Sequence, residues 1–265
     1  MQFAGSLLTK RSFQFPTSKN EILISEVLLL TSDGFPVQSH LSEAHDAKEL
    51  FFVNSYRPDY LVMFKNFIAS QFKKPRGLFG IFTSNMMIKG NQKNYDRLIL
   101  DLNVQPYNKI LEIGFGPGIG IRMITESCPT CTVHGIDFSK LMYQKASKYN
   151  DEFISAARVK LYRADFLKDS VLSNDYDKIF CLNVVYFWNE LKTPFEKVWS
   201  LLKNGGSFHI YMADKKFLID KKTPDSVFNK YSIEQVVKAL QSAGFQNVNY
   251  YTEKGLHIKA TKYLG

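Results

Sequence analysis

The chain has 265 residues and a formal net charge of +9, from 34 basic and 25 acidic residues. This length exceeds one ordinary domain of roughly 150 residues, and no stretch approaches the roughly 20 apolar residues of a membrane-spanning helix, so we expect a soluble, cytoplasmic protein with a core and an extension. The lysines alternate with acidic residues and form no arginine-rich block, which argues against a nucleic-acid partner.

Residues 1–76 match no motif and are predicted to form an N-terminal extension of unknown role. Residues 1–20 contain three basic residues and no acidic one, a weak organelle-targeting composition, although an ordinary disordered start is the simpler interpretation. Residues 21–30 and 60–72 contain enough apolar side chains for helices or strands. The most natural linker to the rest of the chain is Pro75-Arg76-Gly77.

Residues 77–104 come before the first predicted core strand. They contain two closely spaced glycines, Gly77 and Gly80, and then the sequence Asn85-Met-Met-Ile-Lys-Gly-Asn91. A helix is predicted over 92–102 because its apolar residues recur on one helical face.

Residues 109–120 form a short apolar strand that runs directly into a glycine-rich loop. Without Cβ atoms, Gly114, Gly116 and Gly118 can adopt positive φ and let a ligand lie against the backbone, and the N–H groups of the following helix point into the same space. The pattern predicts a nucleotide-like cofactor. A dinucleotide fingerprint would have its third glycine at position 119, where this chain has Ile119, so the pattern disfavours NAD.

The next segments continue an alternation of strands and helices. After a helix over 119–127, a second strand over 132–136 ends at Asp137. A carboxylate at this position can accept both ribose hydroxyls of a nucleotide. Ser139 is a natural N-cap for a helix over 140–150.

Two more predicted strands end in polar or aromatic loops. The third strand, 159–162, leads into Arg163-Ala-Asp-Phe166, and the fourth, 177–182, leads into Asn183-Val-Val-Tyr-Phe-Trp188.

The C-terminal part is predicted to add one parallel strand and a hairpin. A helix over 191–202 is stopped by the glycine pair within 203–207, and a fifth strand follows over 208–212. Ser232 caps a helix over 233–243 that ends at Gly244. The last two strands, 247–251 and 256–261, are joined by a short turn and must be antiparallel.

Residues 109–262 together resemble the class I S-adenosylmethionine-dependent methyltransferases, in their small-molecule, methyltransferase-11-like branch. The glycine loop reads E-x-G-x-G-x-G from Glu112 to Gly118, like the first motif of that family, and the later elements follow in the family's order. Asn204 departs from the proline that the family commonly has before its glycine pair, but asparagine tolerates left-handed conformations. The resemblance implies an α/β fold, with a doubly wound, Rossmann-like, seven-stranded sheet that is mostly parallel and has an antiparallel C-terminal hairpin.

The resemblance also implies that residues 77–265 form the methyltransferase domain and that 77–104 form a lid over cofactor and acceptor. S-adenosylmethionine is the implied cofactor, with Glu112 at the amino end of methionine, Asp137 at the ribose and Asp165 at the adenine amino group. Lys89, Gly90 and Asn91 are expected to face the pocket. The implied cofactor-binding residues are Glu112, Gly114, Gly116, Gly118, Asp137, Phe138, Asp165, Phe166, Asn183, Lys89 and Gly90.

The implied reaction is transfer of the sulfonium methyl group to an acceptor, preferably a small molecule. Tyr186, Phe187 and Trp188 would wall the acceptor side, which suggests an apolar or aromatic compound, although aromatic residues at a strand end are more often core. No residue is a confident catalytic base, and neither the acceptor nor the oligomeric state follows from the sequence. A dinucleotide-dependent oxidoreductase and a non-catalytic binding protein that keeps this fold remain as alternatives.

The three cysteines form an odd set, which argues against a disulfide framework and for a reducing compartment. Cys128 and Cys131 have the spacing of a redox pair, but we expect a structural turn there, and no second pair completes a zinc site, so no metal is predicted. Cys181 is expected in the core of the fourth strand. The strand histidines are expected to be packing residues rather than a general base; they are His134, His209 and His257.

Overall fold

The computed structural model describes residues 58–77, 91, 94–252 and 256–263. These residues belong to one compact unit, Asn54–Gly265. Lys89 and Gly90, which were predicted to lie in a lid, and the segment 21–30 are outside the described residues, as are the first 57 residues. The predicted domain boundary at 76/77 therefore stays a prediction. Within the described ranges, no helix combines the length and apolar character needed to cross a membrane.

The centre of the unit is a seven-stranded sheet with the strand order β3-β2-β1-β4-β5-β7-β6. Strands β1 to β5 pair in parallel, whereas β7 is antiparallel to both β5 and β6, so the predicted fold class is confirmed. The strands are β1 (Lys109–Ile113), β2 (Thr132–Asp137), β3 (Val159–Arg163), β4 (Tyr176–Leu182), β5 (Leu202–Met212), β6 (Gln246–Tyr251) and β7 (Leu256–Thr261).

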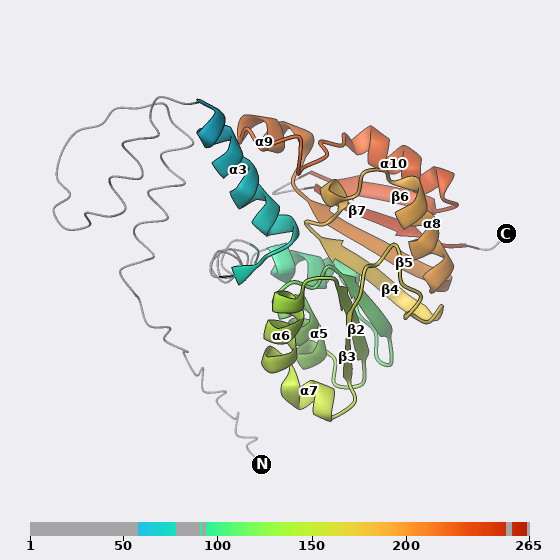
Figure 1. Ribbon diagram of the computed structural model, residues 1–265. Helices are drawn as coiled ribbons and strands as arrows, with labels where there is room; N and C mark the ends of the chain where they lie inside the picture. Colours follow the sequence, from blue (N-terminus) through green and yellow to red (C-terminus); the bar gives the residue numbers. More distant parts are fainter. Residues whose placement is uncertain (1–57, 78–90, 92–93, 253–255, 264–265) are drawn as a thin grey trace, which may run out of the picture. The chain divides into compact units, whose positions relative to one another are not determined.

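Helices cover both faces of the sheet (Figure 1). The longer predicted helices are confirmed to within a residue or two of their ends, and Ser139 and Ser232 cap two of them as predicted. The helices are α3 (Pro58–Lys73), residues 94–102, α5 (Ile119–Ser127), α6 (Lys140–Tyr149), α7 (Asp151–Ser155), the 3₁₀ turn η1 (Val185–Phe187), α8 (Lys192–Leu201), α9 (Lys215–Asp220) and α10 (Ile233–Ser242).

Two hydrophobic cores lie on opposite faces of the sheet. Alternation along β4 shows the division, because Ile179 and Cys181 belong to the core under α8 and α10, while Phe180 and Leu182 belong to the core under residues 94–102, α5 and α6. A parallel sheet buried on both faces explains why these strands read as nearly continuous apolar runs. Cys181 is fully buried, as expected.

The glycine pair before the fifth strand differs from the prediction. Residues 203–207 are not a separate loop after a helix, because β5 begins at Leu202 and its pairing with β4 shifts register between Tyr176 and Lys178. Gly205 has φ +79° and its N–H donates to Lys262 O at 2.8 Å. α8 ends at Leu201 and Leu202 is already extended, so the glycine pair forms an irregularity within the strand, a use of glycine that local sequence does not separate from a helix stop.

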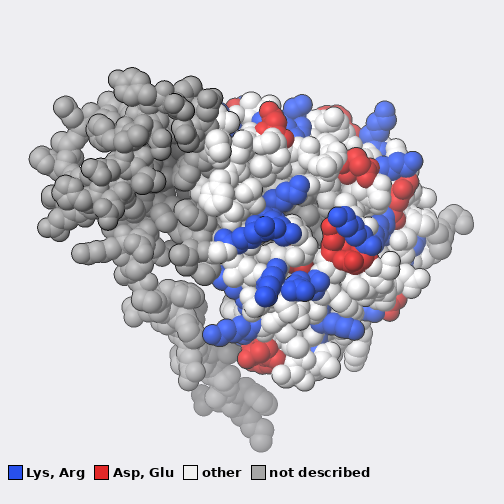
Figure 2. Space-filling model, in the orientation of Figure 1, with Lys and Arg blue, Asp and Glu red and all other residues white. Residues whose placement is uncertain are grey.

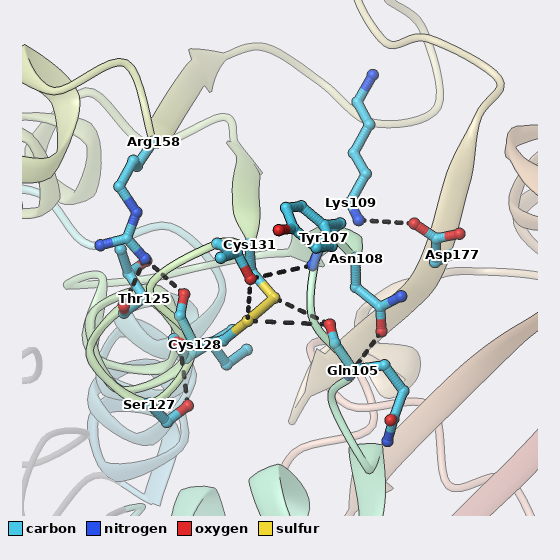
Figure 3. Close-up of a disulfide and its surroundings, with 12 residues drawn as sticks. Gln105, Tyr107, Asn108, Lys109, Thr125, Ser127, Cys128, Cys131, Arg158 and Asp177 are labelled. Carbon is cyan, nitrogen blue, oxygen red and sulfur yellow. Dashed lines mark hydrogen bonds between the residues drawn. A yellow bond between two sulfur atoms is a disulfide. The ribbon is translucent and has the colours of Figure 1, made fainter.

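The expectation that no disulfide forms was wrong. Cys128 and Cys131 are joined by a disulfide in the turn between α5 and β2 (Figure 3). The turn brings their Cα atoms to 5.4 Å, a separation that a disulfide spans without moving the backbone. The predicted turn is present, and Arg158 reinforces it by donating to the backbone oxygens of Thr125 and Cys128 at 2.7 and 2.6 Å. An odd number of cysteines excludes the pairing of all of them, but it does not exclude one disulfide between two neighbouring cysteines.

His134 should make the fold sensitive to acid. Its Nδ1 lies 2.8 Å from Tyr176 Oη, and burial, together with the nearby cations Lys109 and Lys160, lowers its pKa from 6.5 to about 4. In the unfolded chain His134 binds a proton as the pH falls below 6.5, whereas in the folded chain it stays neutral until the pH approaches 4. The unfolding free energy therefore falls as the pH falls through this window.

We predict that the wild type loses about 1–2 kcal/mol more unfolding free energy than His134→Gln between about pH 7 and pH 5, with allowance for partial solvent screening. Urea denaturation of both proteins at both pH values measures the difference. Equal losses in the two proteins would show that His134 titrates normally in the fold.

Candidate functional site

The predicted cofactor residues on β1, β2 and β4 meet at the carboxyl ends of neighbouring strands. The strand order changes direction between β1 and β4, and open α/β sheets bind ligands in the crevice at such a switch point. The glycine loop follows β1 directly, and Gly114 N–H donates to Ile136 O of β2 at 2.8 Å. The loop is therefore fixed over the ends of two strands.

Two glycines of the loop are needed for different reasons. Gly116 has φ +52°, and a Cβ added there would meet no other atom within 4 Å, so this position faces open space. Gly118 has φ +84°, but its added Cβ would lie 2.7 Å from Asn150 Nδ2 and 2.8 Å from Ala146 Cβ. Gly116 leaves room for a ligand, whereas Gly118 lets the start of α5 pack against the end of α6.

Asp137 is held in a fixed orientation at the end of β2. Its Oδ2 accepts from Gly116 N–H at 3.0 Å and its Oδ1 accepts from Ser139 N–H at 2.8 Å. The residue is only 8% exposed, and burial raises the pKa of the carboxyl to about 6 although these two hydrogen bonds oppose the shift. Each oxygen keeps one acceptor site, which suits a pair of vicinal hydroxyls.

Glu112 on β1 is fully buried beneath the loop. Tyr95, from the helix over 94–102, donates its hydroxyl to Glu112 Oε1 at 2.9 Å, while Oε2 has no hydrogen bond with the described residues. Burial, with a smaller contribution from Asp137, raises the pKa of this carboxyl to about 8. An orphaned buried oxygen costs free energy, so this atom is suited to receive a donor from a ligand.

Tyr95 was not among the predicted site residues. Gly120, the second residue of α5, makes room for the pair, because a Cβ there would lie 2.5 Å from the Tyr95 ring and 2.8 Å from Glu112 Oε2. Gly120, two residues after the last glycine of the loop motif, was the only local signal of this contact. It pointed to close packing but not to the partner.

Comparisons with known proteins agree with this geometry. Residues 110–206 match a family model described as a methyltransferase domain. The chain is 24% identical to the uncharacterized methyltransferase YdaC of Bacillus subtilis over 164 residues, which are 62% of this chain and 86% of that protein. It is 23% identical over 155 residues to sterol 24-C-methyltransferase ERG6 of Saccharomyces cerevisiae, covering 54% of this chain but only 40% of that protein. The predicted resemblance of the chain to the class I S-adenosylmethionine-dependent methyltransferase family is therefore confirmed.

Solved methyltransferase structures share the fold. Phosphoethanolamine N-methyltransferase 2 of Haemonchus contortus, solved with S-adenosylmethionine, matches with a TM-score of 0.58 at 16% identity over 70% of this chain and 57% of that one. The methyltransferase SibL matches with a TM-score of 0.59 at 16% identity over 71% of this chain and 60% of that one. S-adenosylmethionine is the family's cofactor, and the open space at Gly116 and the orphaned Glu112 oxygen fit it.

Asp165 and Phe166, predicted near the adenine, lie in the loop after β3. Asp165 Oδ1 accepts from Leu167 N–H at 3.0 Å, and its side chain is 43% exposed, so the carboxylate caps its own turn and also reaches solvent. Phe166 is buried and packs against Trp188, with ring centroids 6.1 Å apart. Phe138, beside Asp137, is 40% exposed at the rim of the site. Their contacts with adenine stay predictions.

Asn183 connects the end of β4 to the predicted lid. Its Nδ2 donates to Asn91 Oδ1 at 2.9 Å, and its φ of +60° is the left-handed conformation that asparagine tolerates. Asn91 is the described part of the lid motif. The structure therefore brings one predicted lid residue against one predicted cofactor residue.

The three aromatic residues predicted to wall the acceptor are mostly packed into the protein. Tyr186 and Trp188 are 6% and 7% exposed, and Tyr186 lies 5.2 Å from the Phe228 ring. Asn229 Nδ2 donates to the backbone oxygens of Tyr186 and Trp188 at 3.1 and 2.9 Å. Phe187 is partly buried in the same cluster. Their role toward an acceptor stays a prediction.

We predict that alanine at the two loop glycines has different effects. Gly118→Ala should lower the unfolding free energy by about 2–4 kcal/mol, because the new methyl group clashes with α6 in addition to the strain of positive φ. Gly116→Ala should cost only about 1–2 kcal/mol of stability but weaken S-adenosylmethionine binding at least about tenfold. Denaturation and calorimetry separate the two effects, and wild-type affinity in Gly116→Ala would show that the ligand lies elsewhere.

We also predict that Tyr95→Phe lowers the unfolding free energy by about 1–2 kcal/mol, because Glu112 Oε1 loses the donor that the structure gives it in a buried site. Tyr143→Phe is a matched control at a partly buried tyrosine, for which the structure gives no hydroxyl hydrogen bond with the described residues. Thermal or urea denaturation measures both. An equal loss in the two variants would assign the effect to packing.

Proposed function

We propose that this protein transfers the methyl group of S-adenosylmethionine to a small-molecule acceptor. The observation that supports this most directly is the juxtaposition of Glu112, Asp137 and the open loop position Gly116 in a methyltransferase fold. The domain over 77–265 would carry the activity, and 77–104 would act as its lid.

Each residue would act on the cofactor in a distinct way. Glu112 would accept from the amino end of methionine through its free oxygen, and Asp137 would accept from the ribose hydroxyls. Asp165 would receive the adenine amino group at the rim. These contacts would align the methyl group, whose sulfonium is already activated, so the protein's main contribution would be orientation and exclusion of water.

The amide pair Asn183 and Asn91 would hold the lid closed beside the methionine end. Deprotonation would be needed only for acceptors that carry a proton on the attacking atom. No side chain of the described residues is assigned as a catalytic base.

The named substrates of the relatives suggest classes of acceptor but do not identify one. They include sterol 24-C-methyltransferases and a malonyl-[acyl-carrier protein] O-methyltransferase, and the fold neighbours include a geranyl diphosphate methyltransferase. Sterols and geranyl diphosphate are small or lipid-like molecules, whereas the malonyl group is named as bound to an acyl-carrier protein. The fold also includes the [4+2]-cyclase SpnF, so a protein that keeps the fold for another purpose is the second candidate.

We predict that Asp137→Ala weakens S-adenosylmethionine binding by about 1–3 kcal/mol, because the ribose hydroxyls lose a charged acceptor in a buried site. Calorimetric titration with S-adenosylmethionine and S-adenosylhomocysteine, with NADH as the comparison ligand, measures this effect. Asp165→Ala is a useful companion, since its carboxylate is far more exposed and should matter less. Unchanged affinity in Asp137→Ala, or binding of NADH alone, would contradict the proposal.

A further inference from the structure

A cavity of about 520 Å³ lies between the segment that follows α3 and the start of α6. Its lining contains four cationic side chains and no Asp or Glu. Figure 2 shows Lys and Arg side chains gathered on this face of the molecule. The four cations are Lys74, Arg76, Lys140 and Arg163.

The four cavity cations have no carboxylate partner among the described residues. Seven other Lys and Arg residues in the described part of the chain lie within 4.0 Å of a carboxylate; they are Arg97, Lys109, Arg122, Lys168, Lys192, Lys203 and Lys230. The structure gives none of the four cavity cations an ion pair with a carboxylate of the described residues. Like charges around one cavity repel one another, and an anion bound between them removes that repulsion.

The cavity walls are fixed by specific contacts. Ser139 Oγ donates to Pro75 O at 3.3 Å, which holds the segment 74–77 against the N-cap of α6. Lys74 Nζ lies 5.1 Å from the centroid of the Phe138 ring, and Arg76 N–H donates to the buried Gln71 Oε1 at 2.9 Å. Lys74 and Arg76 belong to this segment, whereas Arg163 is the last residue of β3 and Lys140 is the first residue of α6. The fold therefore brings the four positive charges together.

S-adenosylmethionine does not account for this charge. Its sulfonium and ammonium groups are cations, and its one anion, the carboxylate, is at the methionine end, where Glu112 is proposed to bind the neighbouring amino group. Neither Glu112 nor the glycine loop lines the cavity, and of the predicted cofactor residues only Phe138 does. The cavity therefore adjoins the adenosyl edge of the proposed site at Phe138, and its four cations need a different ligand.

We propose that this cavity binds the phosphate group of a phosphorylated ligand, either a soluble phosphate ester or a phospholipid headgroup. Two guanidinium groups can each donate paired N–H groups to phosphate oxygens, and two ammonium groups add charge that a phosphate dianion balances. The first N–H groups of α6, a helix of 10 residues, favour an anion at the same place. The inference does not depend on methyl transfer.

The test uses pyrophosphate as the probe and the full-length protein. Calorimetric titration at low salt should show saturable binding to the wild type and binding at least about tenfold weaker to the double variant Arg76→Gln/Arg163→Gln. The matched control is Lys216→Gln/Lys238→Gln, which removes the same charge from exposed positions outside the cavity and should bind as the wild type does. No saturable binding by the wild type, or an equal loss in both variants, would overturn the site and leave only diffuse attraction to net charge.

Vesicle sedimentation identifies the source of the phosphate. Sedimentation with phosphatidylcholine vesicles that contain phosphatidic acid, but not with pure phosphatidylcholine, and its loss in the cavity variant would support a lipid headgroup. Pyrophosphate binding without sedimentation would support a soluble ester. Titration of the same proteins with S-adenosylmethionine separates the two proposals, since the cavity variant should keep wild-type cofactor affinity. A wild type that binds pyrophosphate and not the cofactor would refute only the proposed function.

Discussion

The burial of two carboxylates at adjacent strand ends is the constraint on which the site depends. Removing a carboxylate from water is costly unless hydrogen bonds or charges replace the lost solvation. The fold supplies Asp137 with two backbone donors and Glu112 with one tyrosine hydroxyl. The raised pKa values of both groups follow from this incomplete compensation. The described residues give Glu112 Oε2 no hydrogen bond, and a cofactor with an amino group can provide one.

The helix over 94–102 carries much of this arrangement. It buries Leu98 and Leu102 in the core, and from the same helix Tyr95 reaches Glu112 under the glycine loop. At its other end, Asp101 Oδ2 lies 3.1 Å from His257 Nδ1 on β7. The helix thus joins the cofactor end of β1 to the antiparallel part of the sheet, and a disturbance of its packing would reach Glu112.

Sequence reasoning succeeded where the signal was local. Glycines with positive φ, the serine caps and the alternation of apolar residues each depend on a few neighbouring residues, so the longer helices and all strands except β5, which begins six residues before its predicted start, were predicted close to their observed ends. Features that depend on distant partners were missed. The role of Tyr95 depends on its contact with β1, the Cys128–Cys131 bond depends on the turn geometry, and the strand irregularity near Gly205 depends on pairing with β4. The basic cavity likewise assembles residues nearly 90 positions apart, from Lys74 to Arg163.

The central claim, that the buried Glu112 carboxyl receives the amino end of S-adenosylmethionine, has a direct thermodynamic signature. At about pH 6.5 this carboxyl, with its pKa near 8, is mostly protonated in the free protein, and an ammonium group bound beside it favours the carboxylate. Calorimetric titration with S-adenosylmethionine in two buffers of different ionisation enthalpy measures the protons exchanged on binding. The account predicts net release approaching one proton, lost in Glu112→Gln. Binding with no proton release, or release unchanged in that variant, would contradict it.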